Sequence, residues 1–174
     1  LVGSAEFIAL TVGILAGGLA ARRLGGWVDN LVRWFSLVGL SMPNFFTGMI
    51  LILIFSVTFR ILPSGGYGGI QHLIMPAFAL GWYHSAANTR MTYSSLLQVL
   101  NSEYIKMARI KGLSEISIIG KHALKPALIP IITMSGLHIV RTISGAVAIE
   151  TVFSWPGLGF LMYQGAIYRD FNIV

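Results

Sequence analysis

Four long apolar stretches dominate the pattern of the chain, at residues 1–21, 34–59, 73–100 and 126–149. Each has at least the roughly 20 residues that an α-helix needs to cross about 30 Å of hydrocarbon. The first contains one charged residue, Glu6, and the second contains none. Pro43 and Pro76 interrupt the second and third stretches and are expected to kink them. The pattern predicts an all-α integral membrane protein with about four transmembrane helices.

Composition agrees with this prediction. Charged residues make up 10% of the chain, against about 25% in an ordinary soluble domain, and 55% of the residues are hydrophobic. So few charges could not cover the surface of a soluble protein, and the apolar content argues against a disordered tail. The net charge of +6 would suggest nucleic acid as a partner of a soluble protein. In a membrane protein its distribution over the loops matters instead, and we expect the lipid bilayer, not nucleic acid, as a partner.

Positive charge alternates along the loops. The segments 22–33 and 101–125 carry most of it, whereas the segment 60–72 holds Arg60 alone. The basic residues of the two positive segments are Arg22, Arg23, Arg33, Lys106, Arg109, Lys111, Lys121 and Lys125. The segment after the fourth stretch holds Arg169 with Asp170. Because cytoplasmic loops carry the excess of Lys and Arg, we predict that 22–33 and 101–125 are cytoplasmic and that both ends of this chain lie outside.

Motifs for catalysis are missing from the sequence. The chain has no cysteine, and Gly120-Lys121 is followed by His122 where a phosphate-binding loop needs Ser or Thr. The four histidines lie at least twelve residues apart, so they form no local metal-ligand motif. We therefore expect neither enzymatic activity nor a bound cofactor or metal on this chain.

Polar side chains form a stripe inside the third apolar stretch. His84, Asn88 and Thr92 recur at every fourth residue, which places them on one face of a helix. In the fourth stretch, His138 and Arg141 are expected to share a face, with Arg141 directed at the bundle interior or its outer vestibule. Two interpretations remain open for these residues. They either bond neighbouring helices together or line a water-filled translocation path.

The segment 101–125 is too long and too patterned for a simple turn. Ser102 can cap a first helix, which Gly112 would end in a left-handed conformation. Ser114 can cap a second helix, and Pro126 suits the first turn of the span that follows. We predict a helix–Gly–helix elbow. From physics alone it is either an amphipathic element on anionic lipid or a docking element for a cytoplasmic partner.

Several longer runs carry a resemblance to a known family. The chain reads E-Y-I-K-M-A-R-I-K-G-L-S-E at 103–115, H-A-L-K at 122–125, A-L-I-P at 127–130, G-L-S-M-P at 39–43, L-P-S-G-G at 62–66 and E-T-V-F-S-W-P-G-L-G at 150–159. These runs resemble binding-protein-dependent ABC transporter permeases, more narrowly the dipeptide/oligopeptide/nickel permease family, first-permease type. The chain departs from the general superfamily loop E-A-A-x3-G-x9-I-x-L-P, because Lys106 and Met107 replace its first two letters and Lys125 stands at its proline.

The resemblance implies a transport subunit that pairs with a second permease around a central path. Two cytoplasmic ATPase subunits would bind ATP and Mg²⁺ below it, and an extracytoplasmic solute-binding protein would deliver peptides above it. The elbow would be the coupling helix, with Gly112 as pivot and Ala108 in an apolar, close-fitting contact with one ATPase. The residues that the resemblance assigns to this coupling loop are Glu103, Tyr104, Ala108, Arg109, Lys111, Gly112, Leu113, Ser114 and His122.

The segment after the fourth apolar stretch is rich in aromatic residues and contains a helix-breaking Pro-Gly. Aromatic side chains favour the membrane interface, which is the simpler interpretation. The alternative is an outer gate or a contact for the binding protein, formed by Glu150, Phe153, Trp155, Pro156 and Gly157. We also expect Glu150 to be an acidic neighbour of Arg141.

Other functions remain open at this stage. The same architecture could carry nickel or another solute, and a secondary transporter or channel would need no ATPase. A secondary transporter is expected to contain two halves related as an inverted repeat, which we do not find in this sequence. A secondary transporter or channel would also leave the elbow without a role. The chain begins inside an apolar run and ends where another span could start. We therefore expect residues 1–174 to be a transmembrane domain within a longer permease that has further terminal spans.

Overall fold

The computed structural model describes residues 1–22 and 25–169, so the charges of Arg23 and Asp170 lie outside the described residues. Within them the regular structure is helical, which confirms the predicted all-α class. The helices are α1 (Val2–Arg22), α2 (Trp27–Ser41), α3 (Asn44–Leu51), α4 (Ile70–Leu100), α5 (Glu103–Ile110), α6 (Glu115–Ser117), α7 (Leu124–Val152) and α8 (Leu158–Tyr168). Two π-helical stretches, Ile52–Thr58 and Ile118–Ala123, continue α3 and join α6 to α7.

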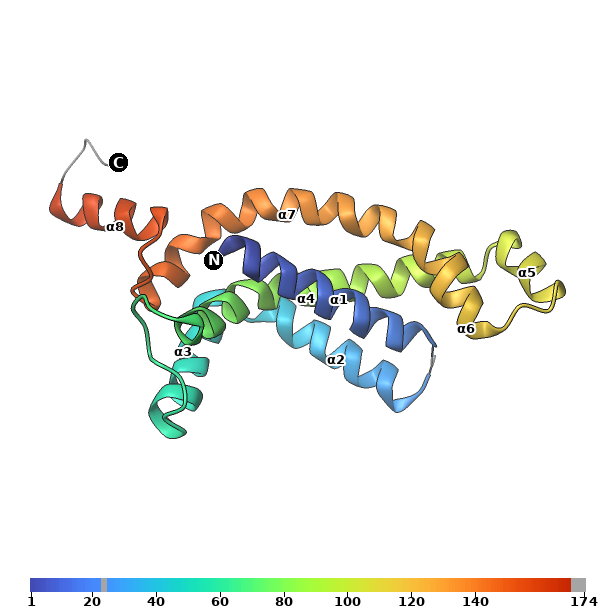
Figure 1. Ribbon diagram of the computed structural model, residues 1–174, viewed down its shortest axis with the longest axis horizontal. Helices are drawn as coiled ribbons and strands as arrows, with labels where there is room; N and C mark the ends of the chain where they lie inside the picture. Colours follow the sequence, from blue (N-terminus) through green and yellow to red (C-terminus); the bar gives the residue numbers. More distant parts are fainter. Residues whose placement is uncertain (23–24, 170–174) are drawn as a thin grey trace.

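Helices α1, α4 and α7 run lengthwise beside one another and form the body of the molecule (Figure 1). Helix α1 lies so close to α4 that a Cβ on Gly13 or Gly17 would stand 2.5–2.6 Å from α4 atoms. Small residues permit this approach, and close packing is what holds helices together where lipid is as apolar as the side chains. The α1–α4 pair therefore forms the centre of the bundle, and α2, α3 and α7 pack against α4.

Within residues 1–22 and 25–169, two helices are long and apolar enough to span a membrane, α1 and the continuous helix from Glu115 to Val152. They match the first and fourth predicted spans. A third is obtained if the bent pair of α2 and the α3 segment counts as one span. Helix α4, at 31 residues, is long enough to span a membrane but is more polar than a typical spanning helix. Within the described residues, length and apolarity therefore identify fewer than the four expected transmembrane helices. The polarity of α4 comes from its polar stripe, which is buried between helices and so does not face lipid.

The second predicted span is not one helix. Helix α2 begins at Trp27, seven residues before the predicted start at 34, and the chain then turns by 107° between Ser41 and Asn44. Met42 and Pro43 are extended there, because proline lacks an N–H and disfavours helical backbone in the residue before it. The expected kink is therefore a break. By contrast, α4 continues through Pro76 without a break, and the kink expected at Pro76 stays a prediction.

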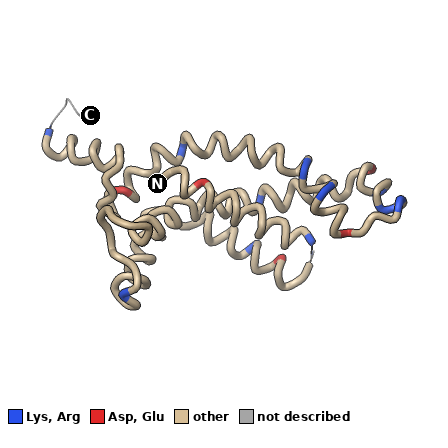
Figure 2. Tube along the Cα trace, in the orientation of Figure 1, with Lys and Arg blue, Asp and Glu red and all other residues tan. Residues whose placement is uncertain are grey.

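Basic residues gather at one end of the bundle (Figure 2). The α1–α2 turn and the elbow around α5 and α6 lie at this end, whereas α3, α8 and the glycine-rich loop after Phe59 lie at the other (Figure 1). The two positive segments therefore share one end, as the alternating loop charge requires. Arg33 and Asp29 belong to the first turns of α2 rather than to a loop.

Candidate functional site

The elbow begins and ends close to the predicted residues. Helix α5 starts after Ser102 and is followed by Gly112 at φ +78°, the left-handed conformation that glycine adopts at little cost. Ser114 caps the next helix by accepting a hydrogen bond from the Ser117 N–H at 3.4 Å. Ser102 differs from the prediction, because its hydroxyl donates to the Val99 carbonyl at 2.6 Å and makes no cap.

One face of the elbow is fixed to the bundle. Ile105 and Ala108 of α5 are buried together with Leu100, Ile118 and Ala123 in a single apolar cluster. Ala108 is only 6% exposed, so it faces this cluster and not a partner surface. The predicted contact of Ala108 with an ATPase is therefore not available in this arrangement. A charge at this position would disrupt the apolar cluster that holds α5 against the bundle.

The opposite face of the elbow is uncovered and carries large apolar side chains among charged ones. Tyr104 and Met107 are more than half exposed, and Ile110 is 80% exposed. Ile116, in the first turn after Gly112, is also exposed. These large apolar side chains are not covered by other described parts of the chain. Such a patch is typical of a surface that contacts either a lipid membrane or a protein partner.

Polar contacts hold the two arms of the elbow together. Arg109 in α5 forms an ion pair with Glu115 at 2.7 Å, across the Gly112 turn. The hydrogen bond from Arg109 to this carboxylate raises the pKa of Arg109, so its guanidinium remains charged. The Tyr104 hydroxyl lies 2.8 Å from His122 Nδ1, which joins α5 to the π-helical turn before α7. Both contacts are exposed, so they orient the elbow more than they stabilise it.

The remaining members of the predicted coupling loop are exposed around this tip. Glu103 pairs with Lys106 at 2.7 Å on the surface of α5. Lys111 and Leu113 flank Gly112, and both are exposed. The elbow therefore combines an apolar tip with a charged rim.

A buried polar cluster lies at the centre of the bundle and joins its three long helices. The Thr142 hydroxyl of α7 donates to Glu6 Oε1 of α1 at 2.7 Å and lies 2.9 Å from His84 Nε2 of α4. Glu6 Oε1 and His84 Nε2 are 4.0 Å apart, and the His84 ring stacks against that of His138 with centroids 4.6 Å apart. All four residues are buried.

The sequence singled out His84 and His138 but missed the partners that connect them. Glu6 carried a usable signal, because it is the lone charge in an apolar run of 21 residues. Thr142 carried none, since a threonine in a membrane helix normally bonds its own helix backbone. Here it also lies 2.8 Å from the His138 carbonyl.

The predicted polar stripe is directed into the bundle. Asn88 and Thr92 are fully buried, as are most atoms of His84 and His138. In this chain these residues therefore lie at helix–helix contacts. His84 contacts Thr142 of α7, whereas the side-chain polar atoms of Asn88 and Thr92 have no hydrogen-bond partner among the described residues, so a bonding role for these two and the translocation path both stay predictions. Arg141 differs, because it is exposed in this chain, although it lies three residues from His138 and only about 60° around α7. Among the described residues it forms no ion pair with Glu150.

Three of the residues predicted to form an outer gate or a binding-protein contact, Glu150, Phe153 and Gly157, have structural roles. The buried Glu150 carboxylate accepts a hydrogen bond from the Phe160 N–H at 3.0 Å and so caps the start of α8. Gly157 is required here, because a Cβ at this position would collide with that carboxylate. Phe153 is buried in a core cluster of the bundle.

Trp155 and Pro156 are the more accessible residues of this segment. The Trp155 ring meets Tyr67 of the glycine-rich loop edge to face, with centroids 5.5 Å apart. The same loop is joined to α7 by the bond from Gly66 N–H to the Phe153 carbonyl at 2.7 Å. The contact with a binding protein stays a prediction for Trp155 and Pro156.

Comparison with known proteins identifies the family. The model of the family described as "binding-protein-dependent transport system inner membrane component" matches residues 11–174. The chain is 41% identical to the oligopeptide transport system permease protein AppB of Bacillus subtilis, and 96% of the chain and 56% of that protein are covered. It is 38% identical to the oligopeptide permease OppB of Salmonella typhimurium, with 99% and 58% covered.

A third relative is the glutathione transport system permease protein GsiC of Escherichia coli, which is 39% identical, with 95% of the chain and 54% of that protein covered. The chain thus spans a little over half the length of the curated relatives it matches. The family model, the level of identity and the membrane-compatible helices agree. The chain therefore belongs to the inner membrane components of binding-protein-dependent transport systems.

Proposed function

We propose that this chain is part of a permease subunit of an ATP-driven importer for dipeptides and oligopeptides. The observation that carries the proposal is the elbow, whose buried face is anchored in the bundle while its apolar tip is uncovered. The names of the relatives support peptides as cargo, since two are oligopeptide permeases and glutathione is itself a tripeptide derivative. The permease would provide the path and no chemistry.

The elbow would dock in a groove of a cytoplasmic ATPase subunit, where ATP and Mg²⁺ bind. The helix that follows Gly112 runs without a break from Glu115 to Val152. A displacement of the tip would therefore be transmitted along a single lever to the far end of the bundle. The ATPases would shift the balance between two arrangements of that bundle. A second permease would complete the path, and a solute-binding protein would contact the opposite end near Trp155 and Pro156.

The distribution of charge supports a cytoplasmic location for the elbow end. The Lys and Arg residues of 22–33 and 101–125 that the structure describes gather there (Figure 2), and cytoplasmic ends carry this excess. The ends of the chain and the glycine-rich loop would then lie outside the cell membrane. Helix α4, about 46 Å long at 1.5 Å per residue, would cross the bilayer with its polar stripe sheltered by α1 and α7.

Ile110→Asp tests the docking of the elbow. Ile110 is 80% exposed, so the substitution should leave the fold intact while it places a charge in the apolar contact. In the full-length permease, expressed with its second permease, ATPases and binding protein, we expect loss of ATPase co-purification and of labelled-peptide uptake. The matched control is Ile70→Asp. Ile70 is 77% exposed and is the first residue of α4, at the end of that helix far from the elbow. Normal ATPase recovery with Ile110→Asp would leave the lipid-surface interpretation of the elbow as the better one.

Cargo is tested separately in the same reconstituted transporter. Unlabelled dipeptides, longer peptides, glutathione and nickel salts would be compared as competitors of labelled-peptide uptake. We expect competition by peptides and none by nickel. Uptake of nickel that peptides do not inhibit would favour the alternative cargo without affecting the proposed coupling.

A further inference from the structure

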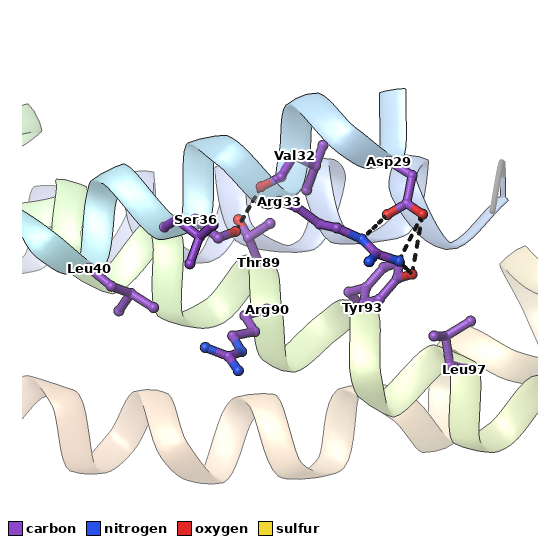
Figure 3. A pocket seen from close by; sticks show the side chains of 10 residues that line it. Asp29, Val32, Arg33, Ser36, Leu40, Thr89, Arg90, Tyr93 and Leu97 are labelled. Atoms are coloured by element: carbon purple, nitrogen blue, oxygen red, sulfur yellow. Dashed lines mark hydrogen bonds and ion pairs between the residues drawn. The ribbon is translucent and has the colours of Figure 1, made fainter. Parts of the chain in front are cut away.

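A groove of about 400 Å³ runs between α2 and α4 in the half of the bundle nearest the elbow. Apolar side chains form most of its walls, and two arginines enter it, one from each helix. Figure 3 shows Arg33 of α2 meeting Asp29 and Tyr93, while Arg90, which also lines the groove, projects from α4 away from that group. The lining residues are Asp29, Val32, Arg33, Ser36, Leu37, Leu40, Thr89, Arg90, Tyr93 and Leu97.

Arg33 is held in a fixed orientation. Its Nε and one terminal nitrogen donate to the two oxygens of Asp29 at 2.9 and 3.0 Å, and that terminal nitrogen also donates to the Tyr93 hydroxyl at 2.8 Å. Asp29 is fully buried, and its second oxygen also accepts from the Gly25 N–H at 3.0 Å. The side chain of Arg33 nevertheless remains 59% exposed, so its other terminal nitrogen can reach a ligand.

The groove has an excess of positive charge. Arg90 is exposed, and within the described part of the chain no ion pair neutralises it. Two guanidinium groups and one carboxylate therefore leave a net charge of +1 on the lining. An arginine without a counter-ion is costly at the depth of lipid, unless its long side chain reaches an anionic group.

The surroundings of the groove are those of a surface that contacts lipid. Trp34, Leu37 and Val38 are all exposed on α2 next to it. Trp27, at the start of α2 and 71% exposed, suits the interface between headgroups and hydrocarbon. Arg33 is six residues from this start, or about 9 Å along the helix, so its guanidinium lies within reach of the headgroup layer.

We propose that this groove binds an anionic phospholipid of the leaflet nearest the elbow. The phosphate would contact the exposed guanidinium of Arg90, with the exposed terminal nitrogen of Arg33 as a second positive group on the same groove, and one acyl chain would follow Leu37 and Leu40. A ligand with one anionic head and an apolar tail matches both the charge and the walls of the groove. Because α2 and α4 are its walls, the lipid would act as a clamp between them. The proposal rests on the membrane placement in the proposed function.

The test uses the full-length permease in its assembled transporter, reconstituted in nanodiscs of phosphatidylcholine with increasing phosphatidylglycerol. Phosphatidylglycerol retained per permease after detergent extraction is measured by mass spectrometry. Removing one charge-assisted contact with Arg90→Gln should reduce retention about tenfold, whereas Arg90→Lys should keep most of it. Arg22→Gln removes the same charge at the same end, outside the groove, and should have no effect. Leu37→Trp should reduce retention by filling the groove with no change of charge.

Equal retention by the native protein and Arg90→Gln, or equal retention of phosphatidylcholine, would overturn the lipid proposal. So would cross-linking of a cysteine at Leu37 to the second permease, or its protection by a transported peptide, because either would identify a different occupant. Peptide uptake is measured on the same nanodiscs. Absence of uptake with lipid retention intact would contradict the proposed function and leave the lipid site standing.

Discussion

Thr142→Val removes the hydroxyl that links the three long helices at nearly constant side-chain volume. The hydroxyl donates to Glu6 Oε1 at 2.7 Å and lies 2.9 Å from His84 Nε2. Its loss leaves both groups without this partner, in a site where each is buried. Some recovery is possible, because Glu6 Oε1 and His84 Nε2 are 4.0 Å apart and could approach each other.

The magnitude follows from two terms. An interhelical hydrogen bond in a membrane protein contributes about 0.6 kcal/mol on average, so the two contacts give roughly 1 kcal/mol. A buried group left without a partner adds about 1–3 kcal/mol, which the approach of Glu6 to His84 would reduce. We expect a net loss of about 2 kcal/mol, which corresponds to a fall of roughly 4 °C in the unfolding midpoint.

The measurement is the thermal midpoint of the purified full-length permease complex in detergent, at one heating rate because membrane complexes unfold irreversibly. Thr151→Val is the matched control. It removes the same hydroxyl from the same helix. Among the described residues that hydroxyl bonds only the Val147 carbonyl of its own helix, so its loss should change the midpoint little. Thr142→Ser keeps the hydroxyl and should restore most of the stability. Equal midpoints for the two valine variants would refute the view that the Glu6–Thr142–His84 cluster holds the bundle together.

Three further predictions concern the elbow, the outer segment and the orientation. Gly112→Val, at φ +78°, should cost about 1–2 kcal/mol of backbone strain and reduce peptide uptake at unchanged membrane abundance. Gly120→Val, in the π-helical stretch, has no positive φ and no close neighbour and should retain more uptake; equal uptake would contradict a pivot at Gly112. Gly159→Val should lower the thermal midpoint, because its Cβ would stand 2.6 Å from the α7 backbone, and an unchanged midpoint would show that α8 can shift. A cysteine at Ser64 should react with an impermeant thiol reagent in intact cells and one at Ser114 should not; the reverse pattern would invert the proposed orientation.

Much of the fold could be predicted from the sequence because the signals are local. Apolar length gave α1 and most of α7, and loop charge placed two distant segments at the same end of the bundle. Gly112 was identified as the stop of α5 because a left-handed residue after a helix is a property of a few neighbouring residues. Capping was predicted correctly at Ser114 and wrongly at Ser102, whose hydroxyl turned back to the preceding helix.

The faces of the helices could not be predicted in the same way. Successive residues of an α-helix differ by about 100° in direction, so Arg141 and Thr142 point to different environments although they are neighbours in sequence. Which of them is buried depends on how α7 is rotated against α1 and α4. The π-helical stretch before α7 changes that rotation, since each wider turn shifts the direction of all later side chains.

The candidate site shows the same division. The sequence located the elbow, the polar residues of α4 and the Glu150 segment, all from motifs and spacing. Only the tertiary structure showed that Ala108 and Glu150 face inward and that Glu6 meets Thr142, 136 residues away. The pairing of Glu6 with Thr142 depends on the close approach of α1 to α4 and α7, because a buried carboxylate without a hydrogen-bond partner is costly wherever it lies in the chain.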